Sequence, residues 1–248
     1  MNKFIIQRYD GFTLVEMAIV LVILGFVLGT LFLPLQAQRE QVFQAQTEAT
    51  LENAKRALVG FAQQQGRLPC PATAASNGAE LPLGGGACTQ QVGFLPAATL
   101  GVEPTDAQGF ALDGWNNRIA YAVAQVNTPG GAATPDFTTP GEMANVGIAT
   151  LAPNIRVCAT STAANCTATI NLINNSALAI YSLGATGSQP AGGVDETENL
   201  NAVASVDIVY VSHDVTVVSA PNGEFDHIVT WISPYVLYNA MIQAGQLR

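Results

Sequence analysis

Residues 12–33 read FTLVEMAIVLVILGFVLGTLFL, and this stretch decides the fold. A helix over this range would be about 33 Å long, which is enough to span the hydrocarbon core of a bilayer. Its Leu, Ile, Val and Phe side chains together favour insertion by several kcal/mol, whereas its single carboxylate, Glu16, costs at most about 3 kcal/mol. The sequence therefore predicts a transmembrane helix at 12–33 that carries one carboxylate.

A cleaved secretory signal peptide and a plain membrane anchor are simpler explanations of the same stretch. A signal peptide has a shorter apolar core and a cleavage site of small residues, which the sequence PLQAQ at 34–38 does not supply. A plain anchor leaves Glu16 unexplained, because a carboxylate inside an apolar helix is costly and indicates a function with a partner.

The residues around Glu16 carry a family resemblance. The sequence GFTLVE at 11–16, preceded by the polar segment MNKFIIQRYD, resembles the prepilin signature of type IV pilins and type II secretion pseudopilins. The resemblance implies a leader at 1–11, cleavage by prepilin peptidase between Gly11 and Phe12, and methylation of the new N-terminal residue. The leader departs from the family pattern at Asp10, where a basic residue is more usual.

Glu16 gains a partner if the leader is removed. Cleavage would place an α-ammonium group on Phe12, close to Glu16 and at the edge of the hydrocarbon, where an unpaired charge is costly. Pairing the ammonium of one subunit with Glu16 of a neighbour neutralises both charges and fixes the register of a helical assembly. We therefore assign Gly11 and Phe12 to processing, and Phe12 and Glu16 to assembly.

Residues 34–66 continue the helix with strong helix formers, mainly Ala, Gln, Glu and Leu. Pro34 is expected to kink the helix without ending it, and Gly66 is expected to end it. This second half should pack on a globular domain, although a free coiled coil is the alternative. The apolar residues that predict its buried stripe are Leu35, Val42, Ala49, Leu58 and Phe61.

From residue 67 to 248 the sequence predicts a β-rich domain, because short β-branched runs alternate with Gly, Pro, Asn and Ser clusters. The strand candidates are 118–124, 146–151, 155–158, 168–172, 178–183 and 206–211. Hairpin-like connections favour a mainly antiparallel sheet, and Ser233-Pro234 predicts a C-terminal helix. The fold class is therefore α+β and pilin-like, with a long N-terminal helix, an antiparallel sheet and a short C-terminal helix.

Parts of this domain extend the resemblance. Residues 113–121 are similar to a turn and strand of major pseudopilins. Residues 68–71, 93–101 and 225–234 are similar to stretches of the large prepilin-like proteins of proteobacteria.

The cysteines all follow the apolar helix, where an extracytoplasmic domain would meet an oxidising compartment. They allow three pairings, of which we favour nearest neighbours because the loops between them have little core of their own. A zinc site is the competing interpretation, but there is no C-x-x-C motif and the two histidines, His213 and His227, are remote in sequence. The cysteines are Cys70, Cys88, Cys158 and Cys166.

Acidic residues gather at Asp195, Glu196 and Glu198, and again at Glu224 and Asp226. Calcium takes oxygen ligands from flexible loops, and some major pseudopilins hold calcium in a C-terminal loop, so the first group is a weak calcium candidate. No EF-hand spacing is present. A solvated acidic loop without a cofactor is the favoured interpretation.

Charge and motifs exclude several functions. The net charge of −9 argues against nucleic acid and against docking on anionic lipid by charge. The sequence lacks the G-x-S-x-G, H-E-x-x-H and phosphate-loop motifs. Ser212, His213 and Asp214 are adjacent, so on a strand they would point to alternate faces, and no enzyme is expected.

The sequence thus predicts a structural subunit stored in the bacterial inner membrane with an extracytoplasmic domain at 67–248. Its expected partners are prepilin peptidase, the assembly platform and other pilin or pseudopilin subunits. The bulk of a domain of about 180 residues favours a minor subunit. The alternative is a monomeric membrane-anchored periplasmic binding domain, which needs neither Gly11 nor Glu16; an anchored hydrolase is a third, weaker possibility.

Overall fold

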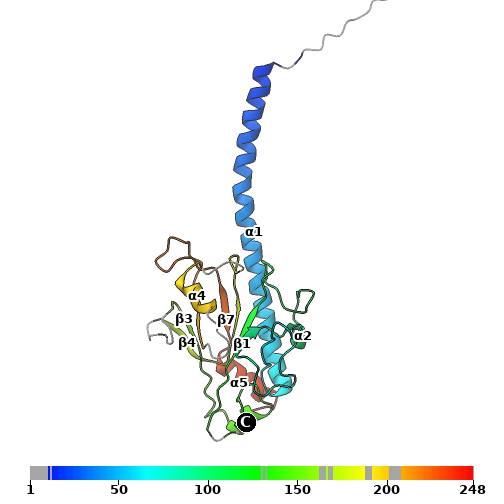
Figure 1. The fold of residues 1–248 in the computed structure, drawn as a ribbon, viewed down its shortest axis with the longest axis vertical. Coiled ribbons are helices and arrows are strands. Elements are labelled where there is room, and N and C mark those ends of the chain that lie inside the picture. Colours follow the sequence, from blue (N-terminus) through cyan, green and yellow to red (C-terminus); the bar gives the residue numbers. More distant parts are fainter. Residues whose placement is uncertain are drawn as a thin grey trace, which may run out of the picture. The chain divides into compact units, whose positions relative to one another are not determined.

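The computed structural model describes residues 11, 13–129, 131, 133–161, 166, 170–187, 192–200 and 208–247, and at 30–37 it describes the backbone alone. The chain divides into two units, Met1–Val42 and Phe43–Arg248. The predicted α+β architecture is confirmed: a long N-terminal helix, a mainly antiparallel sheet domain and a short C-terminal helix (Figure 1).

Helix α1 runs from Leu14 to Gln65 and continues through Pro34. It ends as predicted, because Gly66 adopts a left-handed φ of 67° and its N–H is bonded to the carbonyl of Ala62. Within the first unit, the large apolar side chains from Leu14 to Leu28 are exposed. Among the side chains that the structure describes, no helical stretch is both long enough and apolar enough to cross a membrane.

In the second unit, α1 packs on the sheet through a different stripe from the one predicted. The buried positions are Thr47, Thr50, Leu51, Ala54, Leu58 and Ala62. Of the predicted residues only Leu58 belongs to this face; Val42 and Ala49 are exposed, Phe61 is half-buried, and the side chain of Leu35 lies outside the described part. The predicted stripe consisted mainly of large residues, whereas most of the buried positions carry the smaller residues Thr and Ala.

The described part of the domain contains two sheets. The first has the order β1-β2-β5-β7 and is antiparallel throughout, with Tyr121 of β2 opposite Ile180 of β5. The second has the order β4-β3-β6, in which β3 and β6 are parallel. The strands are β1 (Val92–Phe94), β2 (Ala120–Val123), β3 (Ile155–Cys158), β4 (Asn171–Ser176), β5 (Leu178–Ser182), β6 (Val209–Val211) and β7 (Ile228–Trp231).

Three of the strand candidates contain strands, one is wrong, and two overlap strands but are only partly described. The candidates at 118–124, 155–158 and 178–183 contain β2, β3 and β5. The candidate at 146–151 is wrong, because it begins at the end of a helix and turns at Gly147, which has a φ of 81°. The candidates at 168–172 and 206–211 overlap β4 and β6 but lie partly outside the described residues.

The remaining helices are short: α2 (Ala97–Leu100), α3 (Glu142–Val146), α4 (Val194–Leu200) and α5 (Pro234–Gln243). Helix α5 starts after Ser233 as predicted. It lies near the end of α1 (Figure 1), where Gln63 donates a hydrogen bond to the carbonyl of Ala240. One core joins α1, the first sheet and α5, with Leu58, Tyr121 and Leu237 fully buried in it.

Candidate functional site

The start of α1 is closed by a capping box that involves Glu16. The backbone N–H and the hydroxyl of Thr13 both donate to Oε2 of Glu16, each at 3.1 Å, and the N–H of Glu16 donates to the hydroxyl of Thr13 at 3.2 Å. This reciprocal pattern stabilises a helix N-terminus. The T-x-x-E spacing in the sequence could have revealed this local role.

The capping box uses one carboxylate oxygen of Glu16. Within the described residues, no hydrogen bond reaches its Oε1. The carboxylate can therefore cap its own helix through Oε2 and still present a charged oxygen to another group. Phe12, the expected source of that group, lies outside the described residues.

Among the residues that the structure describes, Gly11 makes no contact that explains a glycine. It is exposed, its φ is not in the left-handed region, and a Cβ atom built on it would meet no atom within 4 Å. A side chain would therefore fit here as far as intramolecular contacts are concerned.

Both disulfides join nearest neighbours in the sequence, which is the favoured pairing. Cys70 is bonded to Cys88 and Cys158 to Cys166, with Cα–Cα distances of 5.4 Å and 5.7 Å. No cysteine is free, so the cysteines are not available for a zinc site. The first bond ties the segment after α1 to the loop before β1.

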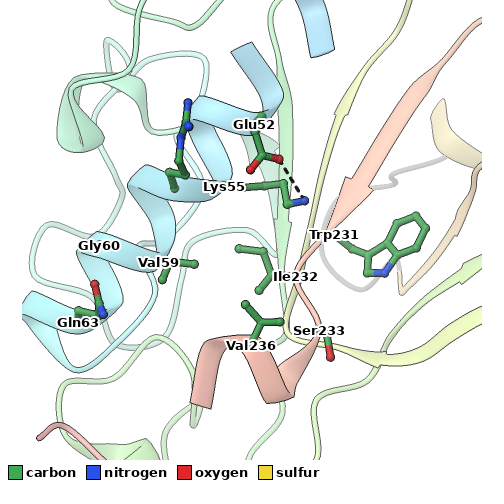
Figure 2. Close-up of a pocket in the computed structure, with 10 residues that line it drawn as sticks. Glu52, Lys55, Val59, Gly60, Gln63, Trp231, Ile232, Ser233 and Val236 are labelled. Atoms are coloured by element: carbon green, nitrogen blue, oxygen red, sulfur yellow. Dashed lines mark ion pairs between the residues drawn. The ribbon is translucent and has the colours of Figure 1, made fainter. Parts of the chain in front are cut away.

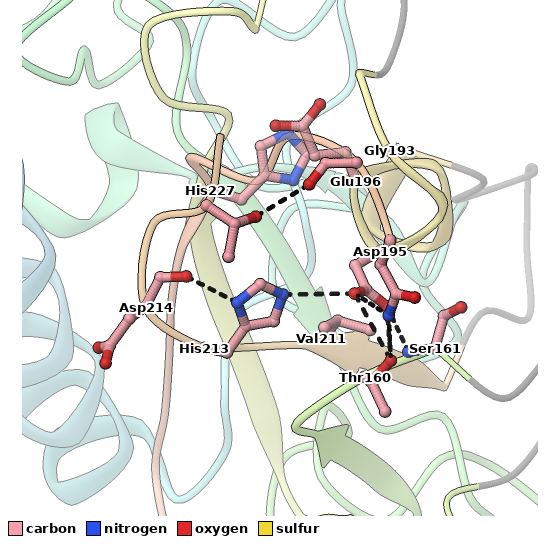
Figure 3. A network of polar contacts seen from close by, with 12 residues as sticks. Thr160, Ser161, Gly193, Asp195, Glu196, Val211, His213, Asp214 and His227 are labelled. Atoms are coloured by element: carbon pink, nitrogen blue, oxygen red, sulfur yellow. Dashed lines mark hydrogen bonds and ion pairs between the residues drawn. The ribbon is translucent and has the colours of Figure 1, made fainter. Parts of the chain in front are cut away.

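The predicted solvated acidic loop is wrong, because Asp195, Glu196 and Glu198 lie on α4 and are buried. Asp195 accepts hydrogen bonds from Thr160, from the backbone N–H of Ser161 and from Asn222, and it lies 3.3 Å from Nε2 of His213 (Figure 3). Burial raises the pKa of Asp195, but the hydrogen bonds and His213 outweigh it, so the pKa lies below its usual range.

Glu196 is likewise held by protein donors. Its two oxygens accept the backbone N–H groups of Gly192 at 2.6 Å and of Asp226 at 3.0 Å. The carboxylates of α4 therefore anchor two loops to the helix. A sequence pattern gives no signal for this, because the donors are backbone groups from distant segments.

Among the described residues, one group of side chains brings possible metal-ligand atoms within 4.8 Å of one another, namely Glu196, Asp226 and His227. Asn199 determines which ring nitrogen of neutral His227 carries the proton. Its Oδ1 accepts the N–H of Val211, so its Nδ2 faces Nδ1 of His227 at 3.3 Å and donates to it. The proton of a neutral His227 is then on Nε2, which makes this nitrogen a donor and a poor metal ligand.

The acidic region therefore acts as a hydrogen-bonded connection between loops. The calcium hypothesis for Asp195, Glu196 and Glu198 stays a prediction, in which an ion would have to displace donors that Asp195 and Glu196 already have. Sequence reasoning missed the amides that organise the region, Asn199 and Asn222, since a lone Asn carries no pattern.

No curated protein and no solved structure matches the chain. Residues 6–32 match the model of the prokaryotic N-terminal methylation motif. This segment spans Gly11, Phe12 and Glu16, the residues on which the resemblance rests. The chain thus carries the signature of type IV pilin and pseudopilin prepilin-like proteins, which are substrates of prepilin peptidase.

Proposed function

We propose that the protein is a minor structural subunit of a type IV pilus or a type II secretion pseudopilus. Residues 12–33 hold it in the inner membrane, residues 67–248 lie outside the cytoplasm, and the N-terminal helix directs assembly after cleavage. The observation that carries this proposal is Glu16, a carboxylate in the first turn of α1, ahead of an uncharged apolar stretch and within the residues that match the methylation motif.

Assembly explains the charge of Glu16, and capping explains only its hydrogen bonds. A glutamine at position 16 could accept the same hydrogen bonds from Thr13. An ionised side chain next to an apolar segment needs an opposite charge, which the ammonium group of a neighbour's Phe12 supplies. The exposed apolar side chains from Leu14 to Leu28 also need a partner that shields them from water, which is either a membrane or other helices.

The second candidate is the monomeric membrane-anchored binding domain, which uses the N-terminal helix only as a tether. The capping box favours it, because a cap gives Glu16 a role in a chain that never assembles. The two functions predict different behaviour for substitutions that separate charge from capping. Glu16→Gln keeps the cap and removes the charge, whereas Thr13→Val removes the cap and keeps the charge.

The test is incorporation of the full chain into filaments sheared from cells that also produce the peptidase. We expect Glu16→Gln and Glu16→Ala to be cleaved and to stay in the membrane, while incorporation falls at least about tenfold, since truncating one member of a desolvated pair costs several kcal/mol. Thr13→Val should assemble normally. Normal assembly of Glu16→Gln would contradict the proposed role of the charge, and a processed wild-type chain that is absent from the filaments would favour the membrane-anchored binding domain.

A further inference from the structure

A groove of about 360 Å³ opens between α1 and the turn from β7 into α5. Val59 of α1 lies opposite Ile232 and Val236, and Lys55 and Glu52 form an ion pair at one end (Figure 2). Arg56 lines the same end and is exposed. The groove therefore combines an apolar floor with an end that carries one net positive charge, that of Arg56, in a chain whose net charge is −9.

Gly60 lies in this groove and is not explained by the fold. It is in the interior of α1, where glycine costs about 1 kcal/mol relative to alanine. Its φ is not in the left-handed region, and a Cβ atom would meet nothing within 4 Å. A glycine that leaves open space on a helix surface suits the close approach of a group from outside the chain.

A second unmatched surface lies in the segment that connects β6 of the second sheet to β7 of the first sheet. Thr216 and Phe225 close a hairpin in this segment, and we call residues 214–218, which form its first arm, the valine hairpin. Val215, Val217 and Val218 are 62%, 68% and 71% exposed, and the carboxylate of Asp214 beside them is exposed too. The hairpin is well ordered by hydrogen bonds. Thr216 pairs with Phe225, and the N–H of Ala220 is bonded to the carbonyl of Val217 at 2.8 Å.

The groove and the valine hairpin complement each other and lie at opposite ends of β7. The hairpin precedes Ile228, whereas the groove begins at Trp231 and includes the first turn of α5. The hairpin offers apolar side chains and a carboxylate, and the groove offers an apolar floor and the exposed Arg56, because Lys55 is already paired with Glu52. Because two different surfaces of one chain match, their contact is heterologous and can repeat from copy to copy.

We propose that the valine hairpin of one copy docks into the groove of the next copy, with its valines on Val59 and Val236 and with Asp214 facing Arg56. This inference rests on the proposed function, because the contact is too small to hold two free domains together. It acts where the N-terminal helices already hold neighbouring copies at high effective concentration.

Cysteine cross-linking of the full chain in assembled filaments tests the contact. No native cysteine is free to interfere. A chain with both Val217→Cys and Val236→Cys should form a ladder of disulfide-linked copies on mild oxidation, whereas each single variant should stay monomeric. The matched control joins Val217→Cys with Leu83→Cys, since Leu83 is 77% exposed and does not line the groove; it should give no ladder.

Two further changes separate docking from folding. Gly60→Leu should raise helix stability, because leucine is the better helix former, yet it should reduce the ladder at least about fivefold by filling the groove. Asp214→Lys should reduce the ladder about fivefold, as expected for a rim charge pair, and Arg56→Glu in the same chain should restore it.

Each outcome bears on the inference. Assembly without a ladder would overturn the inference and leave the proposed function standing. Equally strong dimers of Val217→Cys alone, or cross-links to a different subunit, would also overturn the inference. A chain that is neither processed nor assembled would overturn both. The number of linked copies is a further measurement. A short ladder agrees with a minor subunit. A long ladder supports the contact but contradicts the minor role, because it identifies the chain as a main component of the filament.

Discussion

At the residue scale, Glu16 illustrates how one side chain serves two states of the chain. In the uncleaved chain Thr13 occupies only Oε2 of its carboxylate. Removal of the leader leaves Thr13 in place, so the cap survives cleavage, while a new positive charge becomes available on Phe12. The cap therefore does not compete with pairing, because it uses only one of the two carboxylate oxygens.

His227 carries a pH dependence at the same scale. Its side chain is 4% exposed, and burial lowers its pKa to about 4, although nearby Asp226 acts in the opposite direction. The unfolded chain then binds a proton near pH 6.5 and the folded chain does not, so the free energy of unfolding should fall between pH 6.5 and 4, by up to about 3 kcal/mol. Burial raises the pKa of Asp226, which offsets part of this loss at the acid end.

Denaturant titrations of the full chain across this pH range measure the effect. His227→Gln should flatten the dependence of the unfolding free energy on pH, whatever its effect at neutral pH. His213→Gln, which keeps His227, should retain the drop. An unchanged slope in His227→Gln would show that another group causes the acid sensitivity.

At the element scale, the attachment of α1 to the first sheet depends on a close approach at Gly114. Its N–H donates to the hydroxyl of Thr47 at 2.9 Å, and a Cβ atom would lie 2.2 Å from the backbone oxygen of Phe43. The neighbouring Asp113 holds this turn by accepting the N–H groups of Trp115 and Asn117 and the hydroxyl of Ser182. The turn therefore fixes where α1 joins the domain.

Gly114→Ala should destabilise the domain by about 1–3 kcal/mol, because the obstructing atoms are helix backbone and cannot rotate away. Its φ is not in the left-handed region, so the effect is steric. Gly60→Ala is the matched control and should be neutral or stabilise by up to about 1 kcal/mol. Thermal unfolding of the two variants checks this, and equal melting temperatures would contradict the close approach.

The elements also show what could be predicted from sequence. The C-terminal end of α1 and the start of α5 were predicted correctly, because the signals at Gly66 and at Ser233-Pro234 act locally. Strands β1 and β7 were not among the strand candidates, and the parallel pairing of β3 with β6 was missed because it depends on contacts distant in sequence. The same holds for the acidic residues of α4, whose burial depends on amides and backbone donors from other segments.

At the scale of the whole molecule, the two kinds of proposed contact act on different parts of the chain. The N-terminal residues supply a charge pair in an apolar setting, and the domain supplies a hairpin and a groove at the two ends of β7. Contacts of this heterologous kind build open helical assemblies, because each copy leaves one surface free for the next. The acidic net charge keeps free copies apart until the helices bring them together.

Cleavage between Gly11 and Phe12 is the step on which this assembly depends, so the mass of the mature N-terminal peptide is the decisive measurement. In cells with a prepilin peptidase, the peptide should begin at Phe12 and carry one methyl group. Gly11→Val should remain uncleaved, because the added Cβ atom would obstruct the close approach of the peptidase to the backbone. The domain should still fold, because a Cβ atom on Gly11 would meet no described atom within 4 Å. A mature peptide that begins elsewhere, or a Gly11→Val chain processed like the wild type, would contradict the prepilin assignment.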